Sequence, residues 1–307
     1  MIPAWLRGWV PPRLREIVRL RRHGRLGLTE LYPTWDAAKR QSAGYDEAHI
    51  LAMVDEATNR ARSSEGALFE RDGYLFDHPV TPYPVVACLL RASAVRGGKL
   101  SVLDFGGSLG SSYYQCRSLL SALQELHWTV VEQAHFVARG QEAYETGELH
   151  FRATIEDAAA VHPPDVILFS SVLQYLDDPD DILTRAARLG PAAVLIDRTP
   201  EGDRPTDAYT IQVVPESIVQ ARLAFRIFGK DRLARLLAPA YVRVVEFDTT
   251  DPDMQADDQT VRFRGSFFER RLHDYPVPGP DPVLGDHSQL LFRRAAPDGV
   301  TNGSTGR

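Results

Sequence analysis

Short apolar runs alternate with helical stretches between residues 100 and 197, and this alternation limits the fold more than any other feature. The runs that we predict as strands are residues 100–105, 128–132, 149–151, 166–170 and 193–197. Strand–helix alternation predicts a parallel sheet with helices on both faces, so we expect an α/β protein. Two later runs, residues 241–247 and 261–268, are predicted to form an antiparallel pair at one sheet edge.

The chain divides into four regions by composition and periodicity. We expect a basic helix over residues 1–27, a helical cap over residues 28–97, a main sheet domain over residues 98–274 and an extended, partly disordered tail over residues 275–307. The cap prediction rests on apolar positions at helix spacing, and Gly97-Gly98 ends its last helix. Residues 215–237 are also predicted to be helical.

Charge is distributed unevenly along the 307 residues, whose formal net charge is −6. Residues 1–26 hold seven arginines and a single acid, Glu16, so the remainder is strongly acidic. An acidic body excludes a general nucleic-acid-binding protein, which needs a broad basic face. Two interpretations of the basic segment stay open. It makes a weak contact with an anionic membrane surface, or it docks on its own domain or on another protein, including a second copy in a homodimer.

Cysteine usage and hydropathy indicate the compartment. Cys88 and Cys116 are too few for a disulfide framework, and they lie in no metal-ligand spacing. We expect both to be buried, reduced thiols, and we expect no metal site. No apolar run approaches the roughly 18–20 residues that span a bilayer, and the first residues lack a signal-peptide pattern. These features favour a cytoplasmic location.

A glycine-rich turn follows the first predicted strand, in the segment VLDFGGSLG at residues 102–110. Glycines there permit positive φ and a close ligand approach, and a helix is expected to begin near Ser111 with free N–H groups. The dinucleotide pattern G-x-G-x-x-G is a poor match, because Ser108 and Ser111 replace two of its glycines. The methyltransferase pattern, an acid, one residue and then G-x-G-x-G, fits better. The cofactor residues that we assign from this segment are Asp104, Gly106, Gly107, Ser108 and Gly110.

An acid ends the second predicted strand, in the segment VVE at residues 130–132. The carboxylate of Glu132 can accept hydrogen bonds from both hydroxyls of a ribose, as the corresponding acid does in dinucleotide folds. The acid of the first motif, Asp104, suits a ligand with a free ammonium group. Together and in this order, the two motifs indicate nucleotide binding.

At these motifs the sequence resembles the class I S-adenosylmethionine-dependent methyltransferases. The resemblance covers roughly residues 28–270, and its segments are YPTWDAAKRQSAGYD at 32–46, VLDFGGSLGSSYY at 102–114, WTVVEQ at 128–133, SSVLQYLDDP at 170–179 and LIDRTP at 195–200. It implies a Rossmann-like, seven-stranded, mainly parallel sheet whose last strand is antiparallel. It also implies S-adenosyl-L-methionine as cofactor, with adenine near Thr154 and Ile155, and we assign Gln133 of the second motif to the same site.

Ligands of such sheets meet at the carboxyl ends of the strands. After the fourth strand this selects Ser170 and Ser171, which we assign to the cofactor, and the catalytic candidates Gln174 and Tyr175. Gln174 cannot act as a base, so we expect it to orient a ligand, and for Tyr175 we favour core packing. After the fifth strand, Asp197 and Arg198 follow; Arg198 binds a substrate carboxylate or phosphate, or it pairs with Asp197 and braces the loop. His78 is either a general base or an uninvolved histidine.

The leading hypothesis is methyl transfer to a small-molecule acceptor, such as a sugar or secondary-metabolite hydroxyl. The weakness of every candidate base motivates a second hypothesis, in which the same site cyclises or cleaves S-adenosylmethionine. A third hypothesis is a non-catalytic cofactor-binding assembly module attached through the basic segment. A nicotinamide oxidoreductase fits the glycine spacing poorly.

Overall fold

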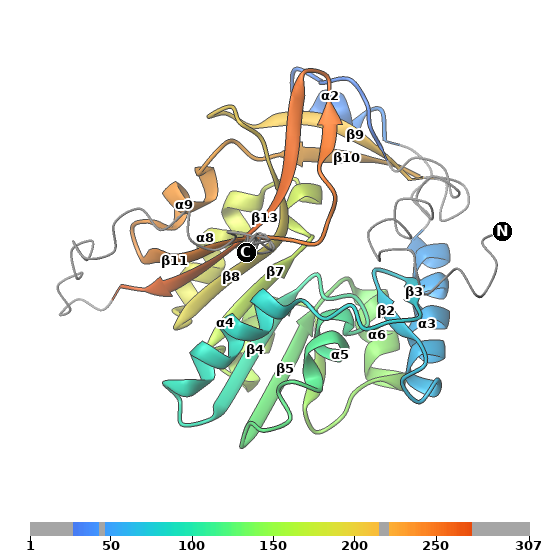
Figure 1. Cartoon of the computed structure of the whole chain (residues 1–307), viewed down its shortest axis with the longest axis vertical. Helices are drawn as coiled ribbons and strands as arrows, with labels where there is room; N and C mark the ends of the chain where they lie inside the picture. The colour runs from blue at the N-terminus through green and yellow to red at the C-terminus, as the bar shows by residue number, and fades with distance from the viewer. Residues whose placement is uncertain (1–26, 43–46, 215–220, 272–307) are drawn as a thin grey trace, which may run out of the picture. The chain divides into compact units, whose positions relative to one another are not determined.

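The structure is a computed structural model that describes residues 27–42, 47–214 and 221–271. The basic helix expected over the first 26 residues and the tail expected from residue 275 lie outside the described residues. Strand and helix labels below follow Figure 1.

The core of the fold is a mainly parallel sheet, as predicted (Figure 1). It has eight strands, of which seven lie side by side in one continuous order and one short strand pairs outside it. Its spatial order is β6 (Leu149–Arg152), β5 (Glu125–Val131), β4 (Lys99–Phe105), β7 (Val166–Ser170), β8 (Ala193–Glu201), β13 (Gln259–Arg270) and β11 (Tyr241–Asp248). The first five strands are parallel, and β13 is antiparallel to both of its neighbours in this order. A short strand, β12 (Met254–Ala256), pairs with the start of β13. The expectation of a Rossmann-like α/β fold is therefore confirmed.

Helices cover both faces of this sheet because its parallel strands are apolar on both sides, as the fully buried run from Val166 to Phe169 shows. On one face lie α3 (Glu47–Ser63), α4 (Tyr83–Ala94), α5 (Ser111–Arg117) and α6 (Ala134–Ala143). On the other face lie α7 (Ile155–Val161), α8 (Pro179–Leu189) and α9 (Arg232–Leu237). Cys88 and Cys116 belong to the first of these two cores, where both are buried and free.

The region before residue 97 contains a β-hairpin that we did not predict. Strands β2 (Phe69–Arg71) and β3 (Tyr74–Phe76) pair through a two-residue turn, Asp72-Gly73. Both turn residues have positive φ, 53° and 77°, which is the conformation that two-residue hairpin turns require. The hairpin contacts α5, directly after the glycine-rich turn (Figure 1).

A second, three-stranded antiparallel sheet consists of β1 (Gly27–Leu28), β9 (Ala208–Val214) and β10 (Ala221–Ile227). The prediction of helix over residues 215–237 is therefore wrong for Ala221–Ile227, and only Arg232–Leu237 forms a described helix, α9. Strand β10 is buried because it packs on the 3₁₀ turn η2 (Leu173–Tyr175) and on Val261 and Phe263 of β13. The short helix α2 (Trp35–Lys39) covers β9 and β10.

Within the described residues, no helix combines the length and the apolar character that crossing a bilayer requires.

Candidate functional site

The glycine-rich turn lies at the carboxyl end of β4, at the point where the strand order of the sheet reverses. Strand β4 has β5 on one side and β7 on the other. The chain therefore leaves this edge toward β5 after β4, and β7 lies on the opposite side. Open α/β sheets bind ligands at such a switch point. A methyl group added to Gly106 would lie 2.5 Å from Val172, which follows β7. The loops after β4 and β7 are therefore in direct contact at this edge.

Backbone geometry of the turn depends on left-handed residues. Gly106, Ser108 and Gly110 have φ values of 75°, 56° and 96°, and α5 begins at the next residue, Ser111. Ser108 stands where the methyltransferase pattern has a glycine, and it adopts a backbone conformation that suits glycine. Left-handed non-glycine residues concentrate at ligand-binding sites, where the surrounding structure holds them.

Asp104 lies beneath this turn, near the end of β4, and is 1% exposed. Its Oδ2 accepts a hydrogen bond of 3.1 Å from the Nε1 of Trp128, and its Oδ1 has no hydrogen-bond partner among the described residues. Burial raises the pKa of this carboxyl group to about 7. A methyl group on Gly107 would lie 2.5 Å from Oδ2, so only glycine lets the turn pass over Asp104.

Glu132 follows the last residue of β5 and joins that strand to the glycine-rich turn. Its Oε1 accepts a hydrogen bond of 3.3 Å from the backbone N–H of Ser108, and its Oε2 accepts one of 2.8 Å from the N–H of Gln133. Burial raises the pKa of Glu132. A carboxylate has about four acceptor positions, so two stay available for the hydroxyls of a ribose.

The residues expected beside adenine lie at the ends of the two outer parallel strands. Gln133 precedes α6 and is exposed. Thr154 caps α7, and its Oγ1 accepts the N–H of Asp157 at 3.0 Å. Ile155 is 1% exposed and belongs to the core beneath α7. An adenine ring at this edge would therefore contact the backbone of Thr154 and Ile155 and the exposed side chain of Thr154.

Polar side chains after β7 and within β8 form a second group. The Oγ of Ser170 donates a 2.9 Å hydrogen bond to Asp197, and the backbone N–H of Ser171 donates one of 3.0 Å to the carbonyl oxygen of Asp197. The Nε2 of Gln174 donates to the Oγ of Ser171 at 3.1 Å. Gln174 is completely buried, and its Oε1 has no partner among the described residues. Burial raises the pKa of Asp197 to about 6.

Arg198 has carboxylate partners that the sequence did not reveal. Its guanidinium lies 2.5 Å from Asp72 of the hairpin turn and 2.9 Å from Asp251, which precedes β12. The side chain of Asp197 hydrogen-bonds Ser170 instead. The two ion pairs raise the pKa of Arg198 further above its ordinary value, against the opposing effect of burial. This geometry favours the bracing interpretation of Arg198, with different acids from the one expected.

Two further catalytic candidates lie in unequal surroundings. The hydroxyl of Tyr175 donates a 2.8 Å hydrogen bond to Gln212 of β9, and its ring packs edge-on against Phe225. Burial raises the pKa of Tyr175, which disfavours its use as a base and favours core packing. The ring of His78 is 57% exposed and lies 2.9 Å from its neighbour Asp77. The described contacts therefore place Tyr175 in the core, and those of His78 are with Asp77 and Phe76.

Glu70 is a residue of this edge that sequence reasoning missed. It lies on β2, is 6% exposed, and accepts hydrogen bonds from the hydroxyl of Ser111 at 2.5 Å and the N–H of Gly73 at 2.7 Å. Burial raises its pKa to about 7. The signal that would have located it is Asp72-Gly73, a dipeptide typical of a hairpin turn, which places Glu70 on a short strand.

Two hollows of the described residues lie elsewhere. One, of about 350 Å³, is lined by residues of β8, α9, β11 and β13, and the other, of about 730 Å³, lies between α8 and α9. Neither is lined by a residue that we assign to the cofactor or to catalysis.

Comparison with known proteins gives similarity at the level of solved structures. No protein-family model and no curated protein sequence matches the chain. The N-terminal domain of EvdMO1, in the presence of S-adenosylhomocysteine and D-fucose, is 17% identical with a TM-score of 0.41, over 71% of this chain and 97% of that one.

Two other solved structures are similar at the same level. The Burkholderia thailandensis 1,6-didemethyltoxoflavin-N1-methyltransferase, with bound 1,6-didemethyltoxoflavin and S-adenosylhomocysteine, is 16% identical with a TM-score of 0.36, over 79% of this chain and 100% of that one. An S-adenosylmethionine-dependent methyltransferase from Methanosarcina mazei is 12% identical with a TM-score of 0.43, over 63% and 99%. These values are too low to transfer a substrate or a residue role to this chain.

Proposed function

We propose that this protein is an S-adenosylmethionine-dependent methyltransferase that acts on a small molecule. The observation that carries the proposal is the acidic character of the switch-point edge. Asp104, Glu132, Glu70 and Asp197 are carboxyl groups whose pKa values burial raises there. The one guanidinium described beside them, that of Arg198, is paired with two other acids.

This charge distribution discriminates between nucleotide cofactors. S-adenosylmethionine carries a sulfonium and an ammonium group, and both stabilise neighbouring carboxylates in their ionised form. A dinucleotide brings a pyrophosphate, whose negative charge would add to that of the acids. An acidic edge therefore favours the adenosyl cofactor over a nicotinamide cofactor.

Each proposed contact follows from a described position. The unpartnered Oδ1 of Asp104 accepts a hydrogen bond from the ammonium group, and Glu132 accepts the ribose hydroxyls. Gly106, Gly107, Ser108 and Gly110 let the turn approach the ligand closely, and Ser170 and Ser171 flank it after β7. Gln133, Thr154 and Ile155 lie at the edge that we assign to adenine.

The chemistry demands alignment and one proton acceptor. The bound cofactor supplies an activated methyl group, and in-line transfer to a hydroxyl leaves S-adenosylhomocysteine and one proton. Gln174 orients the acceptor molecule by accepting a hydrogen bond at its Oε1, which has no partner among the described residues. Asp197, with a pKa of about 6, is ionised at neutral pH and takes the proton, directly or through the hydroxyl of Ser170.

One observation favours a second candidate, non-methylating chemistry on the same cofactor. Tyr175 and Arg198 are both engaged by other side chains, which leaves Asp197 as the main described base. Products other than S-adenosylhomocysteine, found by mass spectrometry after incubation with S-adenosylmethionine, would support this candidate. A module that binds the cofactor without turnover would give no product at all.

The first test is calorimetric titration with S-adenosylmethionine, S-adenosylhomocysteine and NADH. We expect binding of the two adenosyl ligands and none of NADH. Glu132→Ala removes a charged acceptor of the ribose hydroxyls, worth about 2 kcal/mol, so the dissociation constant should rise about 30-fold. The matched control is Glu142→Ala, an exposed acid of α6 whose loss should leave affinity unchanged.

Two results would overturn the proposal. Tight NADH binding would show that the cofactor is a nicotinamide dinucleotide and not S-adenosylmethionine. An unchanged affinity for the adenosyl ligands in Glu132→Ala would show that Glu132 does not bind the cofactor. If binding holds, a library of sugars and other hydroxylated metabolites is screened for S-adenosylhomocysteine formation. If no member of the library gives S-adenosylhomocysteine, the result favours a protein that binds the cofactor without catalysis.

A further inference from the structure

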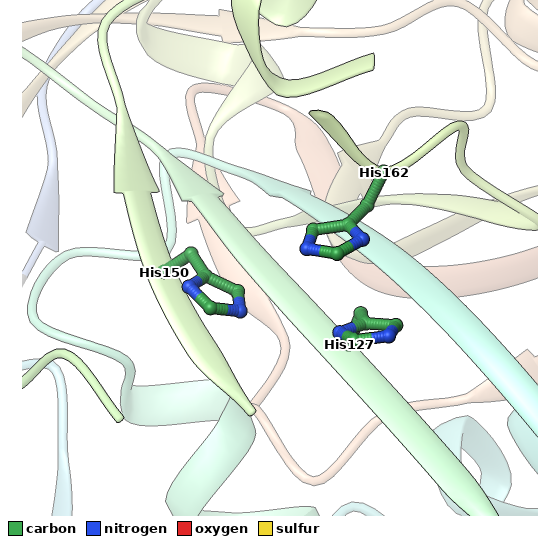
Figure 2. Close-up of side chains that lie close together, drawn as sticks. All are labelled: His127, His150 and His162. Atoms are coloured by element: carbon green, nitrogen blue, oxygen red, sulfur yellow. The ribbon is translucent and has the colours of Figure 1, made fainter. Parts of the chain in front are cut away.

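Three histidines lie together on the face of the central sheet that α7 covers, near the amino ends of β5 and β6 (Figure 2). His127 is the third residue of β5, His150 is the second residue of β6, and His162 follows the last residue of α7. One ring nitrogen of each lies within 4.8 Å of a ring nitrogen of both others. The ring centroids of His127 and His162 are 3.8 Å apart, and those of His150 and His162 are 5.2 Å apart.

The hydrogen bonds of His127 determine which nitrogen can bind a ligand. Its Nε2 lies 3.0 Å from the Oε1 of Glu125, while its Nδ1 is buried without a partner among the described residues. A carboxylate only accepts, so Nε2 carries the proton and Nδ1 carries the lone pair. The other oxygen of Glu125 pairs with Lys99 at 2.7 Å. This ion pair holds the carboxylate in position, so it can orient the imidazole of His127. Metal-ligating histidines have such carboxylate partners.

His150 shows the same division between its two nitrogens. The backbone of Gly147 hydrogen-bonds the imidazole of His150. Its Nε2 is buried and has no partner among the described residues.

We propose that His127, His150 and His162 form a binding site for a divalent transition-metal ion, best matched by Zn²⁺. Three imidazole nitrogens with an open fourth position are a recurrent zinc ligand set, and imidazole prefers Zn²⁺, Ni²⁺ and Cu²⁺ over Mg²⁺ or Ca²⁺. Zn–N bonds of about 2.0–2.1 Å separate tetrahedral ligand atoms by about 3.4 Å. The present separations need shifts of the order of 1 Å per ring to reach this value.

Ring rotation supplies these shifts. The rings of His127 and His162 are stacked with their planes 14° apart, so their in-plane lone pairs lie in separate, nearly parallel planes and do not meet at one point. His162 precedes Pro163-Pro164, and its backbone has the extended φ of −131° that a following proline favours. The backbone is thus fixed, and rotation of its side chain turns the ring toward the other two. A bound ion would then connect the end of α7 to β5 and β6.

This site is separate from the proposed cofactor site and does not depend on the proposed function. His127 precedes Glu132 by five residues along one extended segment, which corresponds to about 16 Å. The expectation of no metal rested on the spacing of the two cysteines. The three histidines are 23 and 12 residues apart in the chain, a spacing that matches no short ligand motif.

The test uses the untagged full-length protein after dialysis against a chelator. Calorimetric titration with Zn²⁺ should show one site with a dissociation constant in the micromolar range or below, and Co²⁺ should give the visible absorption of a nitrogen-rich, low-coordinate site. His150→Ala and His162→Ala should each weaken binding at least 10-fold. Glu125→Gln should weaken it about 10-fold through the orientation of His127.

The control is His49→Ala, an exposed histidine of α3, which should keep the wild-type affinity. Circular dichroism checks the fold of each variant, and His162→Gln replaces any alanine variant that fails to fold. A wild-type dissociation constant in the millimolar range overturns the proposal. So does wild-type affinity in folded His150→Ala and folded His162→Ala.

Discussion

At the residue scale, the contact between Gly107 and Asp104 decides whether the glycine-rich turn can close over the first strand. Asp104 is buried and has an unpartnered oxygen, and the turn passes directly over its carboxyl group. A side chain at position 107 must displace either the turn or the carboxylate. A larger residue at position 107 would therefore disturb both the packing of the turn and the proposed contact between Asp104 and the ammonium group.

We expect Gly107→Ala to weaken S-adenosylhomocysteine binding at least 10-fold, because the new methyl group would lie 2.5 Å from Asp104. The overpacking should also lower the free energy of unfolding by about 1–3 kcal/mol. Calorimetry and urea denaturation measure the two effects. Gly147→Ala is the control, since a methyl group there meets nothing within 4 Å. Equal affinities of Gly107→Ala and wild type would contradict the assigned contact.

Glu70 makes a prediction about pH. Its pKa is about 7 in the folded protein and about 4.5 when unfolded, so the folded state binds more protons between these values. The contribution of Glu70 to the free energy of unfolding therefore falls as pH rises from 5 to 8. Glu70→Gln does not ionise, and it should reduce this fall by an amount on the order of 2 kcal/mol. Urea denaturation across this pH range measures it, and identical slopes for both proteins would disprove it.

Sequence spacing was sufficient to predict the position of those candidate site residues that lie at the end of a strand or directly after it. Asp104 and Glu132 could be placed at the edge because each belongs to a motif at the end of an apolar run. The partners of Arg198 could not be predicted, since Asp72 and Asp251 are 126 and 53 residues away in the chain. Ion pairs at such separations depend on tertiary packing, which local patterns do not encode.

At the scale of elements, Arg198 connects the β2–β3 hairpin to the central sheet. Its side chain is 14% exposed, Asp251 is 15% exposed, and Asp72 is 47% exposed. Asp251→Ala removes the more buried of the two partners and leaves Arg198 with the half-exposed Asp72 alone, so it should cost about 3 kcal/mol of unfolding free energy. Asp72→Ala breaks a solvated pair and should cost about 1 kcal/mol.

Urea denaturation of both variants measures this difference. Asp258→Ala, which removes the exposed partner of Arg204, is the control and should change stability by less than about 0.5 kcal/mol. Equal losses in Asp251→Ala and Asp72→Ala would show that burial does not control the strength of this network.

The five parallel strands were predictable because each has apolar residues close together and lies between helical stretches. The β2–β3 hairpin and strand β10 were not predicted. Strand β10 reads ARLAFRI, in which apolar residues fit either helix or strand spacing. Its pairing with β9 and its burial against η2 decide the outcome, and both are tertiary effects.

At the scale of the whole molecule, the residues proposed for the cofactor lie between positions 104 and 171, far from the basic segment in the chain. Deleting residues 1–26 should therefore change the dissociation constant of S-adenosylhomocysteine by less than about 2-fold, although it removes seven arginines. Calorimetry of the shortened protein measures this. A 10-fold loss of affinity would instead assign the basic segment to the cofactor site.

Pairing between β1 and β9 has a consequence for synthesis on the ribosome. Gly27 and Leu28 pair with Val213 and Gln212, so the first described strand has no partner until the chain is more than two thirds made. At about 5–20 residues per second, this interval lasts about 10–40 s. The parallel strands β4 to β8 emerge within it. Gly27 and Leu28 therefore stay without their β9 partners while these strands emerge, and the small sheet forms only after them.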